Sequence, residues 1–354
     1  MRGYKLEEKI KELDRSGMGD LIYNLPSQIE ETLKIMEEVK FPSPFQGVRN
    51  IIINGLGGSA IGGDLLRGYL REELSLPLLV NRSYTLPQWV GEETLSICVS
   101  YSGNTEETLS SFQASWEKGA QIMGITSGGK LGKECQDKGC PWIKIPSGLP
   151  PRAALGYLFF ALVLSLEKLQ LIKRKREEIL QTKELLEELR EELKPQVYPN
   201  LAIDIASKIH NTIPLIYSTS DFLEGVAMRW KTQINENAKH PCYFCVFPEL
   251  DHNEIMGWEG VERKDFTVVV LMDRYEPERM VKRIENTLKI MGGKPAFLIE
   301  VNARGESLLE RIFSLVYIGD YVSYYLGILN GVDPTEIKSI SLLKKMMRDE
   351  GSSP

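Results

Sequence analysis

Residues 50–64 read NIIINGLGGSAIGGD, an apolar run that ends abruptly in a glycine-rich turn carrying one hydroxyl, Ser59. The three isoleucines predict a buried strand, and the glycines predict a tight turn into a helix. Glycines let the backbone approach an anion, and the free N–H groups and dipole of a helix N-terminus favour negative charge. This stretch therefore predicts a parallel strand followed by a helix whose first turn faces an anionic ligand.

A second turn of the same kind follows the next strongly apolar strand, residues 95–99. It reads SYSGNTEET and places Ser100, Ser102 and Thr105 around a glycine. Neither turn contains a lysine, so the pair indicates a phosphate bound by hydroxyl and backbone N–H groups. Each hydroxyl alone could instead cap a helix, because both turns open helices, and Thr105 is the more typical cap.

Nucleotide sites fit these turns less well. The first turn matches G-x-G-x-x-A loosely, but the next strand ends in Asn81 and Arg82, where a dinucleotide fold places an acid for the ribose. This disfavours NAD, whereas NADP stays open because Arg82 could bind a 2′-phosphate. A P-loop needs Gly-Lys-Ser/Thr, which neither turn has.

The composition is typical of a soluble globular protein. The 354 residues are 42% hydrophobic and 26% charged, and the formal net charge of −6 disfavours a general nucleic-acid surface. The N-terminus is charged, and the longest apolar stretch, 153–166, is too short to span a membrane. We expect a cytoplasmic protein whose five scattered cysteines are reduced; Cys242 and Cys245 have redox or zinc spacing but lie in an apolar strand without a second pair.

Short apolar strands alternate with helices along most of the chain, which predicts an α/β fold with two doubly wound parallel sheets. Strands are predicted at 49–54, 77–81, 95–100, 121–126, 142–145, 213–218, 243–247, 266–271 and 296–301. The expected divisions are N-terminal helices over 1–45, a first α/β domain over 46–152, a helical bridge over 153–199, a second α/β domain over 200–330 and a C-terminal segment with a helix over 331–354. In the second domain, Ser218-Thr-Ser220 is only a faint counterpart of the hydroxyl-rich turns.

Three downstream side chains are suited to proton transfer or charge stabilisation. Glu236 lies near the end of a predicted helix, where the dipole disfavours a carboxylate and so favours a group that takes up protons. His252, in a turn-rich loop, could exchange protons near neutral pH. Arg152 opens a helix against the dipole, which suggests a role beyond helix stability. The plain alternatives are an exposed glutamate, a surface histidine and a structural salt bridge. The three histidines lack metal-ligand spacing, so no catalytic metal is expected.

Six motifs together resemble the bifunctional phosphoglucose/phosphomannose isomerases of the sugar isomerase (SIS) domain superfamily. They are GLGGSAIGGD, SYSGNTEET, PPRAALG, NENAKHP, ELDHNEIMG and GVDP…LLK, and they occur in the family's order over residues 54–344. The resemblance implies two SIS-type domains. It also implies a phosphate site formed by Gly57, Gly58, Ser59, Ser100, Ser102 and Thr105.

The resemblance implies roles for the downstream groups as well. It makes Glu236 the general base, Arg152 the cation that stabilises an enediolate, and His252 the ring-opening group, supplied by the partner subunit of a homodimer. The family's C-terminal lysine falls on Lys344; Lys338 is a rival, but the distance of Lys344 from GVDP matches better.

The implied activity is a metal-independent, cofactor-free interconversion of fructose 6-phosphate with glucose 6-phosphate, and with mannose 6-phosphate, through a cis-enediol. Seven residues before the lysine the family can carry a threonine that helps to accommodate the mannose epimer. Here that position is Ile337, which favours the glucose activity. The alternative is a non-catalytic SIS-type sensor of sugar phosphates, which needs the two turns but not the downstream groups. Neither a nucleic acid nor a membrane is expected as a partner.

Overall fold

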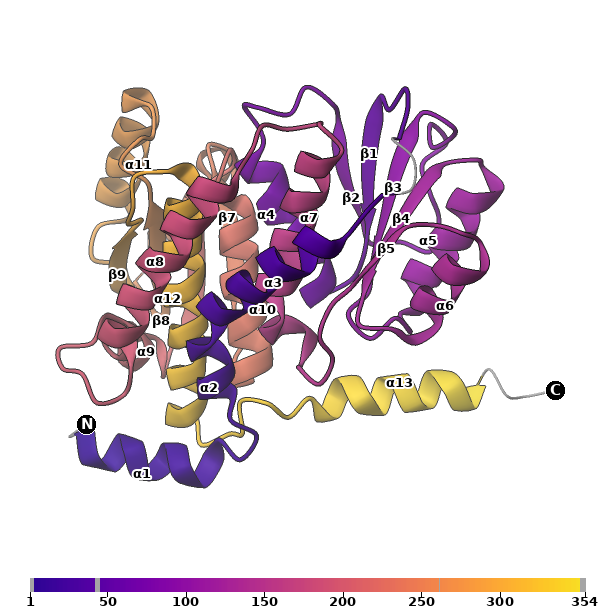
Figure 1. Ribbon diagram of the computed structural model, residues 1–354. Helices are drawn as coiled ribbons and strands as arrows, with labels where there is room; N and C mark the ends of the chain where they lie inside the picture. The colour runs from indigo at the N-terminus through magenta and orange to yellow at the C-terminus, as the bar shows by residue number, and fades with distance from the viewer. Residues whose placement is uncertain (1–2, 42–44, 261, 351–354) are drawn as a thin grey trace.

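The computed structural model describes residues 3–41, 45–260 and 262–350. Two parallel β-sheets stand side by side, and helices fill the space between them and cover their outer faces (Figure 1). The ends of the predicted terminal segments, 1–2 and 351–354, and residues 42–44 lie outside the described residues.

The first sheet has five parallel strands in the order β2-β1-β3-β4-β5. Its elements are β1 (Asn50–Asn54), α4 (Gly58–Tyr69), β2 (Leu78–Asn81), β3 (Thr94–Val99), α5 (Glu106–Glu117), β4 (Gln121–Thr126), α6 (Gly129–Asp137) and β5 (Trp142–Lys144). The chain leaves β1 for β2 on one side and returns to β3 on the other. The carboxyl ends of β1 and β3 therefore form the switch point of the sheet, where open α/β sheets bind ligands.

The second sheet has four parallel strands in the order β7-β6-β8-β9. Its elements are α9 (Leu201–Ile209), β6 (Ile213–Thr219), α10 (Glu224–Ala238), β7 (Tyr243–Phe247), β8 (Arg263–Met272), α11 (Glu278–Met291) and β9 (Pro295–Asn302). Its switch point lies at the carboxyl ends of β6 and β8. Because α10 joins the carboxyl end of β6 to the amino end of β7, the last turn of α10 lies at the opposite, amino end of this sheet.

The remaining helices flank or join the sheets. They are α1 (Gly3–Leu13), α2 (Met18–Tyr23), α3 (Leu25–Glu38), α7 (Leu155–Lys168), α8 (Arg176–Leu193), α12 (Leu308–Leu329) and α13 (Lys338–Glu350), with short 3-10 turns η1 (Pro151–Ala153), η2 (Glu249–His252) and η3 (Glu254–Trp258). The helical run predicted from residue 153 is two helices, because the chain turns after α7, where Gln170 has a φ of 59°.

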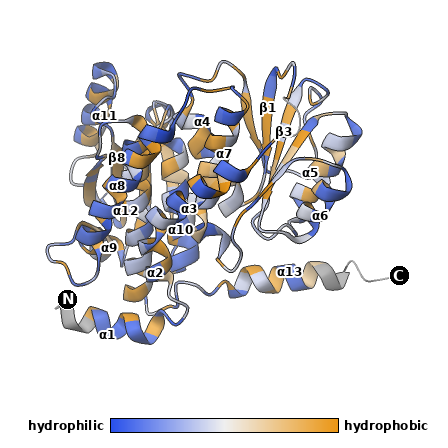
Figure 2. Ribbon diagram, viewed as in Figure 1, coloured by the Kyte–Doolittle hydropathy of each residue, from blue (hydrophilic) through white to orange (hydrophobic). Residues whose placement is uncertain are grey.

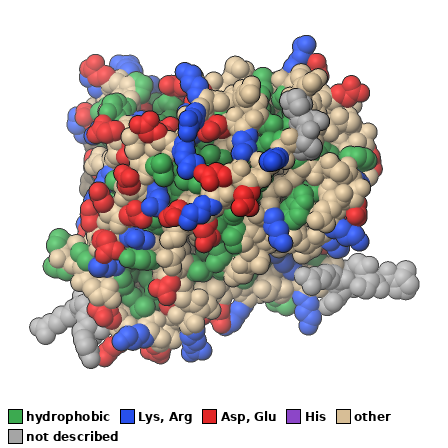
Figure 3. Space-filling view, viewed as in Figure 1, with side chains coloured by type: hydrophobic (Ala, Val, Ile, Leu, Met, Phe, Trp, Pro, Cys, Tyr) green, Lys and Arg blue, Asp and Glu red, His purple; other side chains and the backbone are tan. Residues whose placement is uncertain are grey.

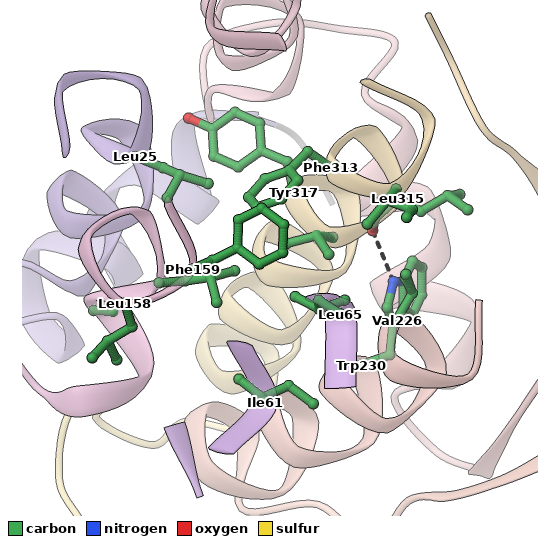
Figure 4. Packing of buried hydrophobic residues seen from close by; sticks show 14 of the residues in the cluster. Leu25, Ile61, Leu65, Leu158, Phe159, Val226, Trp230, Phe313, Leu315 and Tyr317 are labelled. Atoms are coloured by element: carbon green, nitrogen blue, oxygen red, sulfur yellow. Dashed lines mark hydrogen bonds between the residues drawn. The ribbon is translucent and has the colours of Figure 1, made fainter. Parts of the chain in front are cut away.

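α12 is the central core helix. By length and composition it could cross a membrane, but 94% of its most apolar window is buried inside the protein. Phe313 packs against Phe159 of α7 with ring centroids 4.8 Å apart, and the Trp230 indole of α10 donates to the Leu315 carbonyl at 2.8 Å (Figure 4). One hydrophobic cluster therefore includes side chains from both sheets and from α7, α10 and α12.

Polarity follows this arrangement. Apolar residues concentrate in the strands and central helices, whereas α8 and α11 carry polar residues towards the outside (Figure 2). On the face drawn in Figure 3, acidic and basic side chains intermingle rather than separating into patches of one sign. This mixed face is consistent with the small net charge of the chain.

Candidate functional site

Ser59 joins the two hydroxyl-rich turns. It lies in the first turn of α4, its side chain is buried, and its Oγ accepts a hydrogen bond of 3.1 Å from the backbone N–H of Tyr101, just after β3. Gly57, immediately before the helix, has φ 51° and ψ −125°, a conformation that favours glycine. The start of α4 is thereby held at the switch point of the first sheet.

The second turn gathers the other hydroxyls. The buried Ser100 hydroxyl shares a 2.8 Å hydrogen bond with the Thr105 hydroxyl, and the exposed Ser102 Oγ accepts from the Asn104 N–H at 3.3 Å. Thr105 occupies the N-cap position of α5 but makes no side-chain capping bond. Capping therefore does not account for this hydroxyl. The predicted phosphate residues cluster where the first N–H groups of α4 and α5 lack helical partners.

Arg152 connects this cluster to the second domain. A Cβ added to Gly58 would lie 2.7 Å from the backbone nitrogen of Arg152, so η1 packs directly against the glycine-rich turn that opens α4. The Arg152 side chain is 3% exposed, and burial lowers the pKa of its guanidinium while the nearby Glu236 carboxylate opposes this effect. An arginine buried here needs polar partners around its planar group.

Those partners come from α10 and from the turn between α12 and α13. Nε of Arg152 donates to Oδ1 of Asn237 at 2.7 Å, and Nη1 lies 3.3 Å from Oε2 of Glu236. Nη2 donates to the carbonyls of Pro334 at 2.8 Å and Thr335 at 3.1 Å. The arginine thus places its charge beside the carboxylate predicted as the base.

Glu236 and the start of α13 line a pocket of about 590 Å³. The lining residues are Asn235, Glu236, Lys239, Gly331, Val332, Asp333, Glu336, Ile337, Lys338, Ser339 and Ile340. Lys338 belongs to this lining and pairs with Glu336 at 2.7 Å. Lys344, which the motif spacing favours, is exposed further along α13 and is absent from the lining. Within one chain, the structure thus brings Lys338 rather than Lys344 to the pocket of Glu236.

His252 lies away from this pocket. It is exposed on η2, which follows β7, whereas Glu236 lies in the last turn of α10, which precedes β7. β7 has five residues and is about 16 Å long at ~3.3 Å per residue. Its acidic neighbours are engaged elsewhere: Asp251 accepts from Thr287 at 2.7 Å and Glu254 accepts from Tyr217 at 2.9 Å. A single chain therefore does not assemble His252 and Glu236 at one site.

The structure bears on two alternative predictions from the sequence, an NADP site at Arg82 and a redox or zinc site at Cys242 and Cys245. Arg82, the possible 2′-phosphate ligand, forms an ion pair with the buried carboxylate of Asp64. A 2′-phosphate would have to compete with that carboxylate. Cys242 and Cys245 are free thiols, and burial raises the pKa of both, which makes them poor nucleophiles. Among the described residues, no three His, Cys, Asp or Glu side chains are grouped closely enough to hold a metal ion.

Sequence reasoning missed three contributors to the site. Asn237 and Lys239, on either side of the end of α10, and the carbonyls at 333–335 were not singled out. The NENAKHP motif contains the first two, but their partners lie 85 to 95 residues away in the sequence. Only the folded chain shows that Asn237 contacts Arg152 and that Lys239 shares the Pro334 carbonyl with it.

The chain has two doubly wound parallel sheets, and two hydroxyl-rich turns meet at the switch point of the first sheet. This combination defines a SIS-domain protein. The family model for the bacterial phospho-glucose isomerase C-terminal SIS domain matches residues 199–347. The whole chain also has the fold of a hypothetical protein from Thermus thermophilus. The TM-score is 0.76 at 16% identity, covering 99% of this chain and 95% of that one.

The chain belongs to the family of bifunctional phosphoglucose/phosphomannose isomerases. The member from Caldicellulosiruptor bescii is 44% identical over 336 residues, which cover 94% of this chain and 99% of the relative. The member from Aquifex aeolicus is 36% identical, covering 86% of this chain and 92% of the relative. The resemblance drawn from the motifs is confirmed, and family membership places the chain among the isomerases.

Proposed function

We propose that this chain is an aldose–ketose isomerase that interconverts fructose 6-phosphate with glucose 6-phosphate and mannose 6-phosphate. The observation that carries the proposal is the position of Arg152. Its backbone packs against Gly58 of the first phosphate turn, and its guanidinium reaches Glu236 at 3.3 Å. A sugar phosphate anchored at the turns can thus present its other end to a cation and a carboxylate. The names of the relatives support this substrate class.

In the proposed reaction, the Glu236 carboxylate takes the proton from C2 of the open-chain aldose. The electron pair of that C–H bond forms a C1–C2 double bond, and O1 becomes the negative oxygen of a cis-enediolate, which Arg152 stabilises. The O2 proton then moves to O1, and Glu236 returns its proton to C1 as the carbonyl forms at C2. Rotation about C2–C3 allows both C2 epimers to share this enediol.

Ring opening needs groups beyond these two. We assign it to His252 of a partner subunit, assisted by a lysine of α13. Family spacing favours Lys344 for that role, and the pocket lining favours Lys338. Ile337 lines the pocket at the position where the family can carry a threonine for the mannose epimer. The activity on mannose 6-phosphate therefore has to be measured separately.

The deciding assay supplies fructose 6-phosphate in excess EDTA, without nucleotide, and measures glucose 6-phosphate and mannose 6-phosphate separately. We expect conversion under these conditions. A requirement for an added metal would overturn the metal-independent mechanism. Binding of fructose 6-phosphate without conversion would favour the non-catalytic sensor.

Glu236→Gln tests the base directly. We expect kcat to fall by ~10²–10⁴, the usual contribution of a general base, because the amide cannot take the C2 proton. Sugar-phosphate binding, measured by calorimetry, should survive because the hydroxyl turns are unchanged. Glu224→Gln, in the first turn of the same helix, is the matched control and should retain activity. Full turnover in Glu236→Gln would remove Glu236 from the mechanism.

A further inference from the structure

Lys239 has an unusual backbone conformation for a lysine. It ends α10 in the left-handed region, with φ 51° and ψ 40°. Glycine commonly takes this position after a helix, because a Cβ is strained there. A strained backbone at a non-glycine residue beside a candidate active site indicates that the side chain of that residue has a function.

The Lys239 ammonium is surrounded by carbonyl oxygens. Nζ donates to the carbonyl of Glu236 at 3.0 Å, of Asp333 at 2.6 Å and of Pro334 at 3.3 Å. A lysine ammonium has three N–H donors, so each donor has one acceptor here. One carbonyl belongs to the last turn of α10, and the other two belong to the turn that leads to α13.

The same turn supports the catalytic arginine. Pro334 accepts from both Lys239 and Arg152, and Thr335 accepts a second bond from Arg152. Lys239 also lines the pocket of Glu236 together with Asp333 and the first residues of α13. Movement of this turn would therefore displace the Arg152 guanidinium and one wall of the pocket.

We propose that Lys239 is a positioning residue of the isomerase site, whose ammonium holds the turn at 333–335 against the end of α10 and so fixes Arg152 beside Glu236. The proposal rests on the function proposed above. It assigns Lys239 no contact with the reacting atoms.

The protonation state of Lys239 supports this role. Burial, followed by the charge of Arg152, lowers the pKa of Lys239 to about 8, while the carboxylates of Asp333, Glu336 and Glu236 oppose the shift. A neutral amine has only two N–H donors and turns a lone pair towards one carbonyl. All three bonds are therefore made below pH 8, and one of them is lost as the pH rises through that value.

The test compares Lys239→Met, Lys239→Arg and Lys239→Gly with the unaltered chain, and Lys231→Met on the same helix is the control. We expect the Met and Gly variants to lose ~10- to 100-fold in kcat, the scale of a misplaced catalytic group. The wild-type pH–rate profile should fall on the alkaline side near pH 8. This fall should vanish in Lys239→Arg, which stays charged and retains most of the activity.

Lys239→Gly separates positioning from folding. The Met and Gly variants both lose the three hydrogen bonds of Lys239, but only glycine relieves the backbone strain at φ 51°. Lys239→Gly should therefore unfold at a higher temperature than Lys239→Met and yet be equally slow. An alkaline fall that persists in Lys239→Met, or a kcat within twofold of wild type in both Met and Gly variants, would overturn the proposal. If the wild type had no isomerase activity, the proposed function itself would be overturned. That outcome is measured before any variant is made, so the two failures are distinguishable.

Discussion

At the scale of single residues, Gly58 is the contact between the proposed phosphate site and the Arg152 backbone. A methyl group there would lie 2.7 Å from the backbone nitrogen of Arg152 and 2.8 Å from the carbonyl carbon of Pro151. Backbone atoms cannot rotate aside, so Gly58→Ala must shift the turn or η1. We expect a loss of about 1–3 kcal/mol in unfolding free energy and a raised KM for the sugar phosphate, measured by denaturant titration and steady-state kinetics.

Gly62, one turn further along α4, is the matched control. A Cβ there would find its nearest neighbours at 3.6 Å, in ordinary van der Waals contact. Gly62→Ala should therefore gain about 0.5–1 kcal/mol, because alanine is the better helix former, and leave KM unchanged. Equal effects of the two substitutions would show that Gly58 is not a special contact point.

The candidate residues were predictable from the sequence to different degrees. Ser59 lies in the glycine-rich stretch that follows β1, and Ser100 directly follows β3, so local pattern alone predicts that they meet at one sheet edge. The Arg152–Glu236 pair spans 84 residues, and the family resemblance rather than any local signal suggested it. Lys239 was overlooked because a lysine after a helix looks like an ordinary surface residue, and its left-handed backbone is not visible in the sequence.

At the scale of elements, the two switch points differ in charge. The first presents free helix N-termini and hydroxyls. At the second, the hydroxyl of Thr219, the last residue of β6, donates to the buried carboxylate of Glu276 at 2.5 Å, and Asp273 after β8 pairs with Arg311 at 2.9 Å. At the second switch point, the hydroxyl at the end of the strand is thus already bonded to a carboxylate of the protein.

Glu276→Gln tests the cost of that carboxylate. Burial, with Asp273 and Asp221, raises the pKa of Glu276 despite the hydrogen bond from Thr219 and the charge of Arg311. A carboxyl whose pKa is raised by folding stabilises fully below its unfolded pKa and loses that contribution as pH rises through the folded value. The glutamine keeps an acceptor for Thr219 without a charge. The melting temperature of the Glu276→Gln variant should match that of the wild type near pH 4 and exceed it at pH 7. A variant that is less stable than the wild type at both pH values would refute a destabilising charge on Glu276.

Elements were the most predictable level of the fold. All nine predicted strands are present, because short apolar runs separated by amphipathic helices leave few alternatives. Boundaries inside helical runs were less predictable: the turn after α7 has no proline, so the run from residue 153 looked continuous. The position of α13 depends on the turn at 333–335 and its distant partners. The sequence therefore predicted the helix but could not decide between Lys338 and Lys344.

At the scale of the whole molecule, the separation of His252 from Glu236 makes a specific prediction about assembly. The two lie on opposite ends of β7, so one chain cannot apply both to one sugar, whereas two chains related by a twofold axis can exchange them. We expect Glu236→Gln and His252→Asn to be nearly inactive as separate proteins. A heterodimer of the two contains one site with both native groups and one site with neither.

Unfolding the two variants together and refolding an equimolar mixture should therefore restore activity. Random pairing makes half of the dimers mixed, and one of the two sites in each is intact, so about a quarter of the wild-type activity should return. Size-exclusion chromatography checks that the refolded species is a dimer. A mixture of Glu236→Gln with Glu224→Gln,Glu236→Gln is the control, because no pairing of these chains contains a native Glu236. Two outcomes would show that His252 does not act across an interface: full activity of His252→Asn alone, or an inactive mixture in which mixed dimers had formed. Ring opening would then need a proton donor within the pocket of Glu236, and Lys338 lines that pocket.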